Sequence, residues 1–252
     1  MGSDEGGGWR LNRFLARAGV ASRRACDRLI AEGAVRVNGK TVLSPAVRVE
    51  PGDRISCMGE MVVLPEPRTA VLNKPIGYET TLAEGARRSI PELLRGLPFT
   101  GGVPVGRLDI NTGGVLLISS DGELVHRLTH ARWGVEREYR LALSEDPPAG
   151  LLEKLRKGAV IGPGERSRPI MVRQAGPRGI LLVLATGRNR EVRRLADACG
   201  VPLAGLERVR YGCIRAEGLE RGAWRMLTAA ELAELRGLVG LSRPKRPAGS
   251  TS

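Results

Sequence analysis

A glycine-bounded loop, residues 106–114, places one carboxylate, Asp109, two positions after a cation, Arg107. The apolar, β-branched run 115–119 comes directly after the loop and predicts a buried strand, and Asp121-Gly122 predicts the turn that ends it. Asp109 is therefore expected on an irregular loop anchored by a core strand, a common position for reactive groups. A single Asp between glycines is also a common turn former, so the loop alone leaves both interpretations open.

Arginine dominates the charge of this chain. Only five of the 40 basic residues are lysines, and 27 acidic residues leave a formal net charge of +13. Guanidinium groups bind phosphate through paired donors and stack on bases, so this excess favours a nucleic-acid partner. A genome biased towards arginine codons would give the same excess, and the 34 glycines agree with that alternative.

The chain carries no pattern of a secreted or membrane protein. Its four cysteines (Cys26, Cys57, Cys199 and Cys213) are far apart, so we expect core thiols in a reducing cytoplasm rather than disulfides or a metal site. Residues 1–8 lack the basic and apolar regions of a signal peptide, and no apolar run approaches about 18 residues, so no membrane span is expected.

Two short helices and a hairpin are expected near the start of the chain. Apolar residues recur at helical spacing over 11–18, and Ser22 is expected to cap a second helix over 23–32. Asn38-Gly39 is a strong hairpin turn signal, and a last strand is expected over 54–57. Arginines at the start of the second helix oppose the helix dipole unless an anion, such as a phosphate, binds there.

This first unit resembles the S-four RNA-binding domain. The resemblance covers residues 11–56 and is carried by the strings 15–24, 35–39 and 51–53. It implies an RNA-binding module in which Arg23 and Arg24 contact the substrate; the alternative is that these arginines only solvate a helix face. We predict an RNA-binding domain over 10–57, an extended linker over 58–68, a catalytic domain over 69–241 and a disordered basic tail over 242–252.

The second domain resembles the pseudouridine synthases that modify ribosomal RNA. The string from Gly106 to Leu128 carries that family's signature, in which the Asp, here Asp109, is the essential catalytic residue. The segment 70–78 resembles the lysine-proline-x-glycine segment of the family. That match implies a substrate-binding role for Lys74, which an ordinary strand-end lysine would also explain, and places Thr81 at the family's threonine position.

Two further motifs support the resemblance. In 134–141, Tyr139 takes the role of the family's essential Tyr, with Arg137 as the basic residue two positions before it and Ala131 where a Pro is usual. In 186–195, the resemblance implies that Arg193 pairs with the catalytic carboxylate and leaves neighbours such as Arg190 to phosphate. Glu191 replaces the usual Gln, which puts a base-recognition role there in doubt.

The resemblance implies an α+β protein: a small α+β RNA-binding domain followed by a mixed, mainly antiparallel β-sheet catalytic domain with flanking helices. It implies isomerisation of uridine to pseudouridine in rRNA, large-subunit rRNA more than small-subunit, by a cytoplasmic monomer that needs no cofactor and no metal. His126 and His130 are one helical turn apart, but a solvent-facing or capping role is expected. Arg107 is expected to fill the gap left by an extruded uridine. The alternative function is a non-catalytic RNA-binding factor in ribosome assembly.

Overall fold

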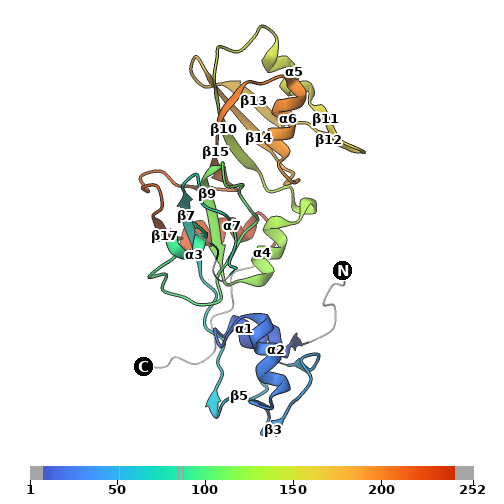
Figure 1. Ribbon diagram of the computed structural model, residues 1–252, viewed down its shortest axis with the longest axis vertical. Helices are drawn as coiled ribbons and strands as arrows, with labels where there is room; N and C mark the ends of the chain where they lie inside the picture. The colour runs from blue at the N-terminus through green and yellow to red at the C-terminus, as the bar shows by residue number, and fades with distance from the viewer. Residues whose placement is uncertain (1–7, 51, 84–85, 87, 242–252) are drawn as a thin grey trace. The chain divides into compact units, whose positions relative to one another are not determined.

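A computed structural model describes residues 8–50, 52–83, 86 and 88–241; the predicted tail, 242–252, lies outside this part of the chain. The chain forms two compact units (Figure 1). The first runs to Arg68 and also includes Leu97–Gly102, and the second contains Thr69–Gly96 and the chain from Val103 onward.

The first unit packs two helices on a small antiparallel sheet. Ser22 caps the second helix by accepting a hydrogen bond from the Ala25 amide at 3.3 Å. Asn38 and Gly39 both have positive φ, as the predicted hairpin turn requires. The elements are β1 (Trp9–Arg10), α1 (Leu11–Arg17), α2 (Arg23–Ala31), β2 (Val35–Val37), β3 (Lys40–Thr41), β4 (Arg48–Val49), β5 (Ile55–Cys57) and β6 (Glu60–Met61), with a sheet order of β3-β2-β5-β6.

The expected linker begins later than predicted. Met58 and Gly59 have φ values of 50° and 88°, which turn the chain back so that β6 pairs with β5. A turn with two positive-φ residues matches the twist of a hairpin, but Met is an unusual residue at such a position, so no sequence pattern predicted this turn. Residues 97–102, which were expected in the second domain, also belong to the first unit.

The second unit is built on a nine-stranded sheet with helices on its faces. Along the main path the strand order is β13-β14-β10-β15-β9-β7-β17, while β8 pairs with β9 and β16 with β15. All of these pairs are antiparallel except β15 with β9, which confirms the expected mixed, mainly antiparallel sheet. The strands are β7 (Thr69–Lys74), β8 (Val103–Pro104), β9 (Gly113–Ser119), β10 (Arg137–Leu143), β13 (Met171–Gln174), β14 (Gly179–Leu184), β15 (Leu203–Tyr211), β16 (Ile214–Arg215) and β17 (Trp224–Met226).

The helices of the second unit are α3 (Ile90–Leu93), α4 (Gly122–Thr129), the 3-10 turn η1 (Ala131–Trp133), α5 (Leu151–Lys157), α6 (Glu191–Cys199) and α7 (Ala229–Gly237). Asp121 caps α4, because its carboxylate accepts from the Glu123 and Leu124 amides. A separate hairpin is formed by β11 (Ala159–Gly162) and β12 (Glu165–Ser167). No helix of the described residues is both long and apolar enough to cross a membrane.

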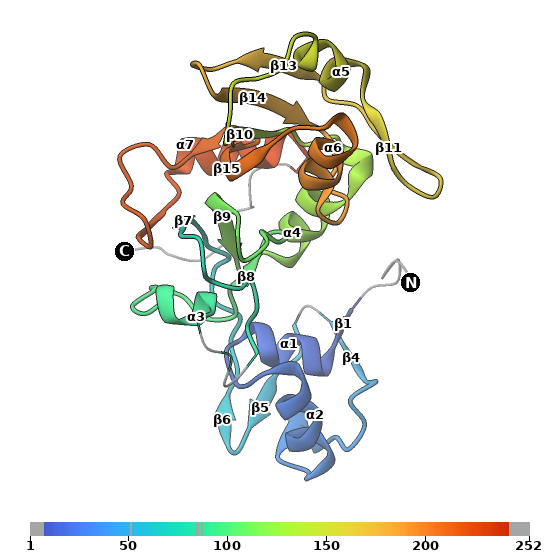
Figure 2. The same ribbon diagram turned by 45° about the horizontal axis from the view of Figure 1, so that its top comes forward.

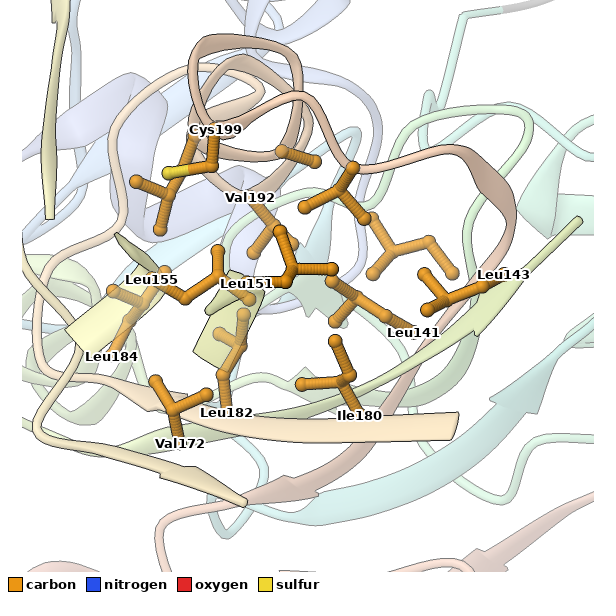
Figure 3. Close-up of a cluster of buried hydrophobic side chains, with 14 of the residues drawn as sticks. Leu141, Leu143, Leu151, Leu155, Val172, Ile180, Leu182, Leu184, Val192 and Cys199 are labelled. Atoms are coloured by element: carbon orange, nitrogen blue, oxygen red, sulfur yellow. The ribbon is translucent and has the colours of Figure 1, made fainter. Parts of the chain in front are cut away.

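Two cores lie against the sheet. One is formed by leucines of β10 and β14 that meet apolar residues of α5 and α6, and its side chains point towards one another in Figure 3. The other lies between α4, α7 and the strands β7 and β9, where Leu117, Leu124 and Leu235 are fully buried. The cysteines are free thiols; three are buried, Cys213 is half-buried, and burial raises the pKa of each, for Cys213 to about 11.

The two halves of the sheet meet at a short parallel pairing between β9 and β15. Gly113 and Gly114 lie opposite Glu207 and Arg208. A Cβ on Gly114 would lie 2.2 Å from the Arg208 carbonyl oxygen, and φ at this position is +101°. Only glycine permits this backbone conformation and this close approach, so the junction depends on the last residue of the loop that carries Asp109.

Candidate active site

Asp109 lies on the loop before β9, and backbone contacts hold this loop on both sides. The Thr112 amide donates to the Asp109 carbonyl at 3.0 Å, which closes a turn. Thr80 makes two hydrogen bonds to Leu108, the residue before Asp109. Its buried hydroxyl donates to the Leu108 carbonyl at 2.7 Å and accepts from the Leu108 amide at 3.2 Å. Thr81, the residue expected to matter from the sequence, instead accepts from the Ala83 amide at 3.1 Å. The threonine that contacts the catalytic loop is therefore Thr80.

Lys74 holds the Asp109 loop through hydrogen bonds from its ammonium group. It ends β7, and its ammonium donates to the carbonyl oxygens of Pro75 (3.1 Å), Asp109 (3.2 Å) and Thr112 (3.0 Å). Three donors thus meet three acceptors. Burial lowers the pKa of Lys74 to about 8, while the charge of Asp109 opposes this shift. Because the side chain is fully buried, it does not offer the substrate contact that was predicted, and its geometry is that of a positioning residue.

Two guanidinium groups approach the Asp109 carboxylate from the start of α6. Arg190 Nη1 lies 3.4 Å and Arg193 Nε lies 3.7 Å from Asp109 Oδ2. Arg193 also donates through Nη2 to the Asn111 carbonyl at 2.7 Å and to the Thr112 hydroxyl at 3.3 Å. Arg193 therefore lies close to Asp109, as the predicted pairing requires, and Arg190 approaches the same carboxylate oxygen.

Glu191 is a buried carboxylate that organises the segment carrying these arginines. Its Oε1 accepts from the hydroxyls of Ser167 (2.8 Å) and Thr186 (2.6 Å), and its Oε2 accepts from the Arg188 amide (3.0 Å). A glutamine would present an NH₂ group to one of these donors, since only its carbonyl oxygen accepts. Glu191 therefore acts on the protein's own backbone and hydroxyls.

Two buried arginines stack on the ring of a buried tyrosine. The guanidinium carbons of Arg137 and Arg208 each lie 4.9 Å from the ring centre of Tyr211. Arg137 donates to the carbonyls of Thr186 and Leu128, and Arg208 donates through Nε to the Val115 carbonyl at 2.8 Å. These contacts join three segments around the site. Sequence reasoning did not find Arg208 or Tyr211 as site residues, because both lie outside the motifs that carry the predicted site residues.

These groups surround a cavity of about 170 Å³. Tyr139, which is partly buried on β10, lines it, as do Asp109 and the exposed side chain of Arg107. Six arginines line the cavity against the two carboxylates Asp109 and Glu191, so it suits an anionic ligand. The arginines are Arg107, Arg137, Arg188, Arg190, Arg193 and Arg208.

The remaining predicted site residues lie elsewhere. Arg23 and Arg24 are exposed on the first turn of α2, in the first unit. His130 accepts from the Arg132 amide through Nδ1 at 3.2 Å and so caps η1, and its ring centre lies 5.7 Å from that of His126. The described residues contain no cluster of three His, Cys, Asp or Glu side chains that could hold a metal ion.

Two parts of this chain match known protein families. Residues 9–55 match the S4 domain, and residues 68–198 match the RNA pseudouridylate synthase family. The ribosomal large subunit pseudouridine synthase B of Bacillus subtilis is 34% identical, over 91% of this chain and 96% of the relative. The protein of that name from Salmonella typhimurium is 39% identical, over 92% of this chain and 84% of the relative.

A solved structure described as a pseudouridylate synthase superposes with a TM-score of 0.64 at 28% identity, covering 90% of this chain and 99% of that one. The chain therefore belongs to the RNA pseudouridylate synthase family: it is an RNA pseudouridine synthase, an isomerase, that carries an S4 domain at its N-terminal side.

Proposed function

We propose that this enzyme converts a specific uridine of large-subunit rRNA to pseudouridine. The observation that carries the proposal is the Asp109 carboxylate, which two arginines approach in the lining of a cationic cavity that Tyr139 also lines. Relatives named for the large ribosomal subunit, at 34% and 39% identity, support the choice of substrate. We further propose a cytoplasmic monomer that acts on rRNA or on an assembling ribosomal subunit.

The reaction breaks the bond between ribose C1′ and uracil N1, turns the base, forms a bond from C1′ to C5, and transfers the C5 proton to solvent while N1 gains one. Asp109 acts in its ionised form on the sugar or the base. Arg193 and Arg190, whose guanidinium nitrogens lie 3.7 Å and 3.4 Å from the carboxylate, stabilise that charge and fix the side chain.

Tyr139 stacks on the extruded uracil, and its hydroxyl assists proton movement at C5. Arg107 is exposed at the rim of the cavity, where it enters the space that the uridine leaves in the RNA. Lys74 and Glu191 position the site's own segments, because Lys74 donates to three backbone carbonyls and the Glu191 carboxylate accepts from two hydroxyls and a backbone amide.

The test is a map of pseudouridines in both rRNAs from a strain that lacks the gene. We expect one large-subunit pseudouridine to disappear and to return with the wild-type gene. Loss of a small-subunit pseudouridine would instead assign the enzyme to that rRNA. A complete set of modifications in the deletion strain would contradict the proposal and favour an assembly role for the protein.

The S4 domain is expected to supply affinity through phosphates. Changing Arg23→Ala together with Arg24→Ala should weaken rRNA binding and reduce the slope of log affinity against log salt by about one to two units, since each neutralised phosphate contributes roughly 0.7–0.9. Affinity across a salt series measures this effect. Arg36→Ala with Lys40→Ala is the matched control, because both residues are exposed on the sheet of the same unit and the charge change is equal. Equal effects of the two pairs would contradict a specific role for the start of α2.

A further inference from the structure

The hairpin of β11 and β12 stands apart from the main sheet. Its strands pair only with each other, and Ala159 lies opposite Ser167 while Val160 lies opposite Arg166. In Figure 2 the hairpin projects from the second unit beside α6. Residues 157–168, which comprise the end of α5 and this hairpin, are called the hairpin arm here. No residue of the arm lines the Asp109 cavity, so its function is not explained by the site already described.

Hydrogen bonds connect the hairpin arm directly to the arginine segment of the active site. The Ser167 hydroxyl donates to the buried Glu191 carboxylate at 2.8 Å. Arg188, which lines the cavity, donates to the Arg166 carbonyl at 2.6 Å, and Arg194 of α6 donates to the Ile161 carbonyl at 3.0 Å. The arm and the cavity rim therefore form one continuous surface of the second unit.

The exposed side chains of the hairpin arm are mainly cationic. Successive residues of an extended strand point to opposite sides, so Ser167 faces Glu191 while Arg166 and Arg168 face solvent. The single acidic residue of the arm, Glu165, is paired with Arg194 at 2.5 Å. Among the described residues, Lys157, Arg166 and Arg168 have no carboxylate partner, although Arg166 donates to the carbonyls of Lys157 and Gly158. Val160, opposite Arg166, is 63% exposed and offers an apolar surface.

We propose that the hairpin arm binds the phosphates of the RNA strand beside the target uridine. The inference rests on the proposed function, since it needs an RNA whose uridine occupies the Asp109 cavity. Arginines and a lysine on a hairpin that hydrogen bonds connect to α6 suit a phosphate backbone, which they contact without reading sequence. Because Arg188 links the cavity to the arm, a strand leaving the cavity meets the arm next.

The test changes Lys157→Ala together with Arg168→Ala in the full chain. In the described part of the chain, neither side chain makes a hydrogen bond or an ion pair that the fold needs. With large-subunit rRNA as the probe, we expect at least about tenfold weaker binding and a salt slope reduced by about 1.4–1.8 units, the contribution of two phosphates. Backbone cleavage footprints of the bound RNA should lose protection at nucleotides flanking the target uridine and keep it elsewhere.

Arg140→Ala with Arg173→Ala is the matched control. Both residues are exposed on β10 and β13, on the face of the sheet opposite the core that α5 and α6 cover, and the charge change is the same. Equal losses in the two pairs, or unchanged binding in the arm pair, would overturn the inference. If wild-type protein forms no pseudouridine in that rRNA, the proposed function fails instead, so the two failures are distinct.

Discussion

Changing Asp109→Asn should lower the rate of pseudouridine formation at saturating RNA by at least about 10⁴-fold, in the range seen when a central catalytic group is removed. The amide keeps the size of the carboxylate but is neither a base nor an effective nucleophile. RNA affinity should stay within a few-fold, because the arginines that line the cavity remain. Single-turnover rates with an rRNA fragment, measured alongside RNA affinity, check both expectations.

Asp146→Asn is the matched control for this change. Asp146 is an exposed carboxylate of the same unit, it pairs with Arg178 at 2.9 Å, and it does not line the cavity. The control removes the same charge beside the same kind of partner, so its rate should match wild type. An Asp109→Asn enzyme that turns over within tenfold of wild type would remove Asp109 from the chemistry.

Changing Lys74→Met should lower the saturated rate by about a hundredfold, the size expected when a catalytic group is misplaced by about 1 Å. Methionine fills a similar space but leaves the carbonyls of Pro75, Asp109 and Thr112 without their shared donor. Loss of a buried partner costs about 1–3 kcal/mol for each group left unsatisfied. Single-turnover rates at saturating RNA and thermal unfolding measure the two consequences.

Rate and stability should respond to alkaline pH in opposite directions in the wild-type enzyme. Burial lowers the pKa of Lys74 from 10.5 to about 8, so between these values the unfolded chain holds the proton more often than the folded protein. Raising the pH through this window therefore favours the folded state and removes a cost that is fully present below pH 8. The neutral amine, however, donates only two hydrogen bonds to three carbonyls, so the rate should fall above pH 8.

The variant Thr80→Val distinguishes the effect of Lys74 titration on the rate from the effect of weaker hydrogen bonding in the Asp109 loop. This change removes both hydrogen bonds to Leu108 but no titratable group. We expect Thr80→Val to be slower at every pH and to keep the decline above pH 8, whereas Lys74→Met should lack that decline. A pH dependence in Lys74→Met that parallels wild type would contradict the role of the ammonium.

Local signals predicted the elements that carry motifs. The Ser22 cap, the Asn38-Gly39 turn and the apolar run before Ser119 each determine local structure within a few residues, and the structure has α2, the β2–β3 hairpin and β9 at those places. Helix α5 and the hairpin arm carry no motif of this kind and were not predicted. Their structure depends on packing against α6 and on the Ser167–Glu191 hydrogen bond, partners that are distant in sequence.

The roles of the buried cations were beyond local reasoning. A charged residue at a strand position is usually exposed, yet Lys74, Arg137 and Arg208 are buried because they donate hydrogen bonds to backbone carbonyls of other segments. Every residue has a backbone carbonyl, so the sequence does not show which carbonyls accept these hydrogen bonds. The signal that was present for Lys74 is its place at the end of a strand with the apolar centre Ala70–Leu72.

The short pairing of β9 with β15 has a consequence for how activity is acquired. It joins residues roughly ninety positions apart in the chain, a wider separation than in the neighbouring pairings of β15 with β10 and of β9 with β7. Contacts of such long range carry a large loop-closure entropy and tend to form late in folding. Asp109 belongs to one half of the sheet and Arg193 and Tyr139 to the other, so each half can be complete and still inert. Enzymatic competence thus reports the closure of this junction.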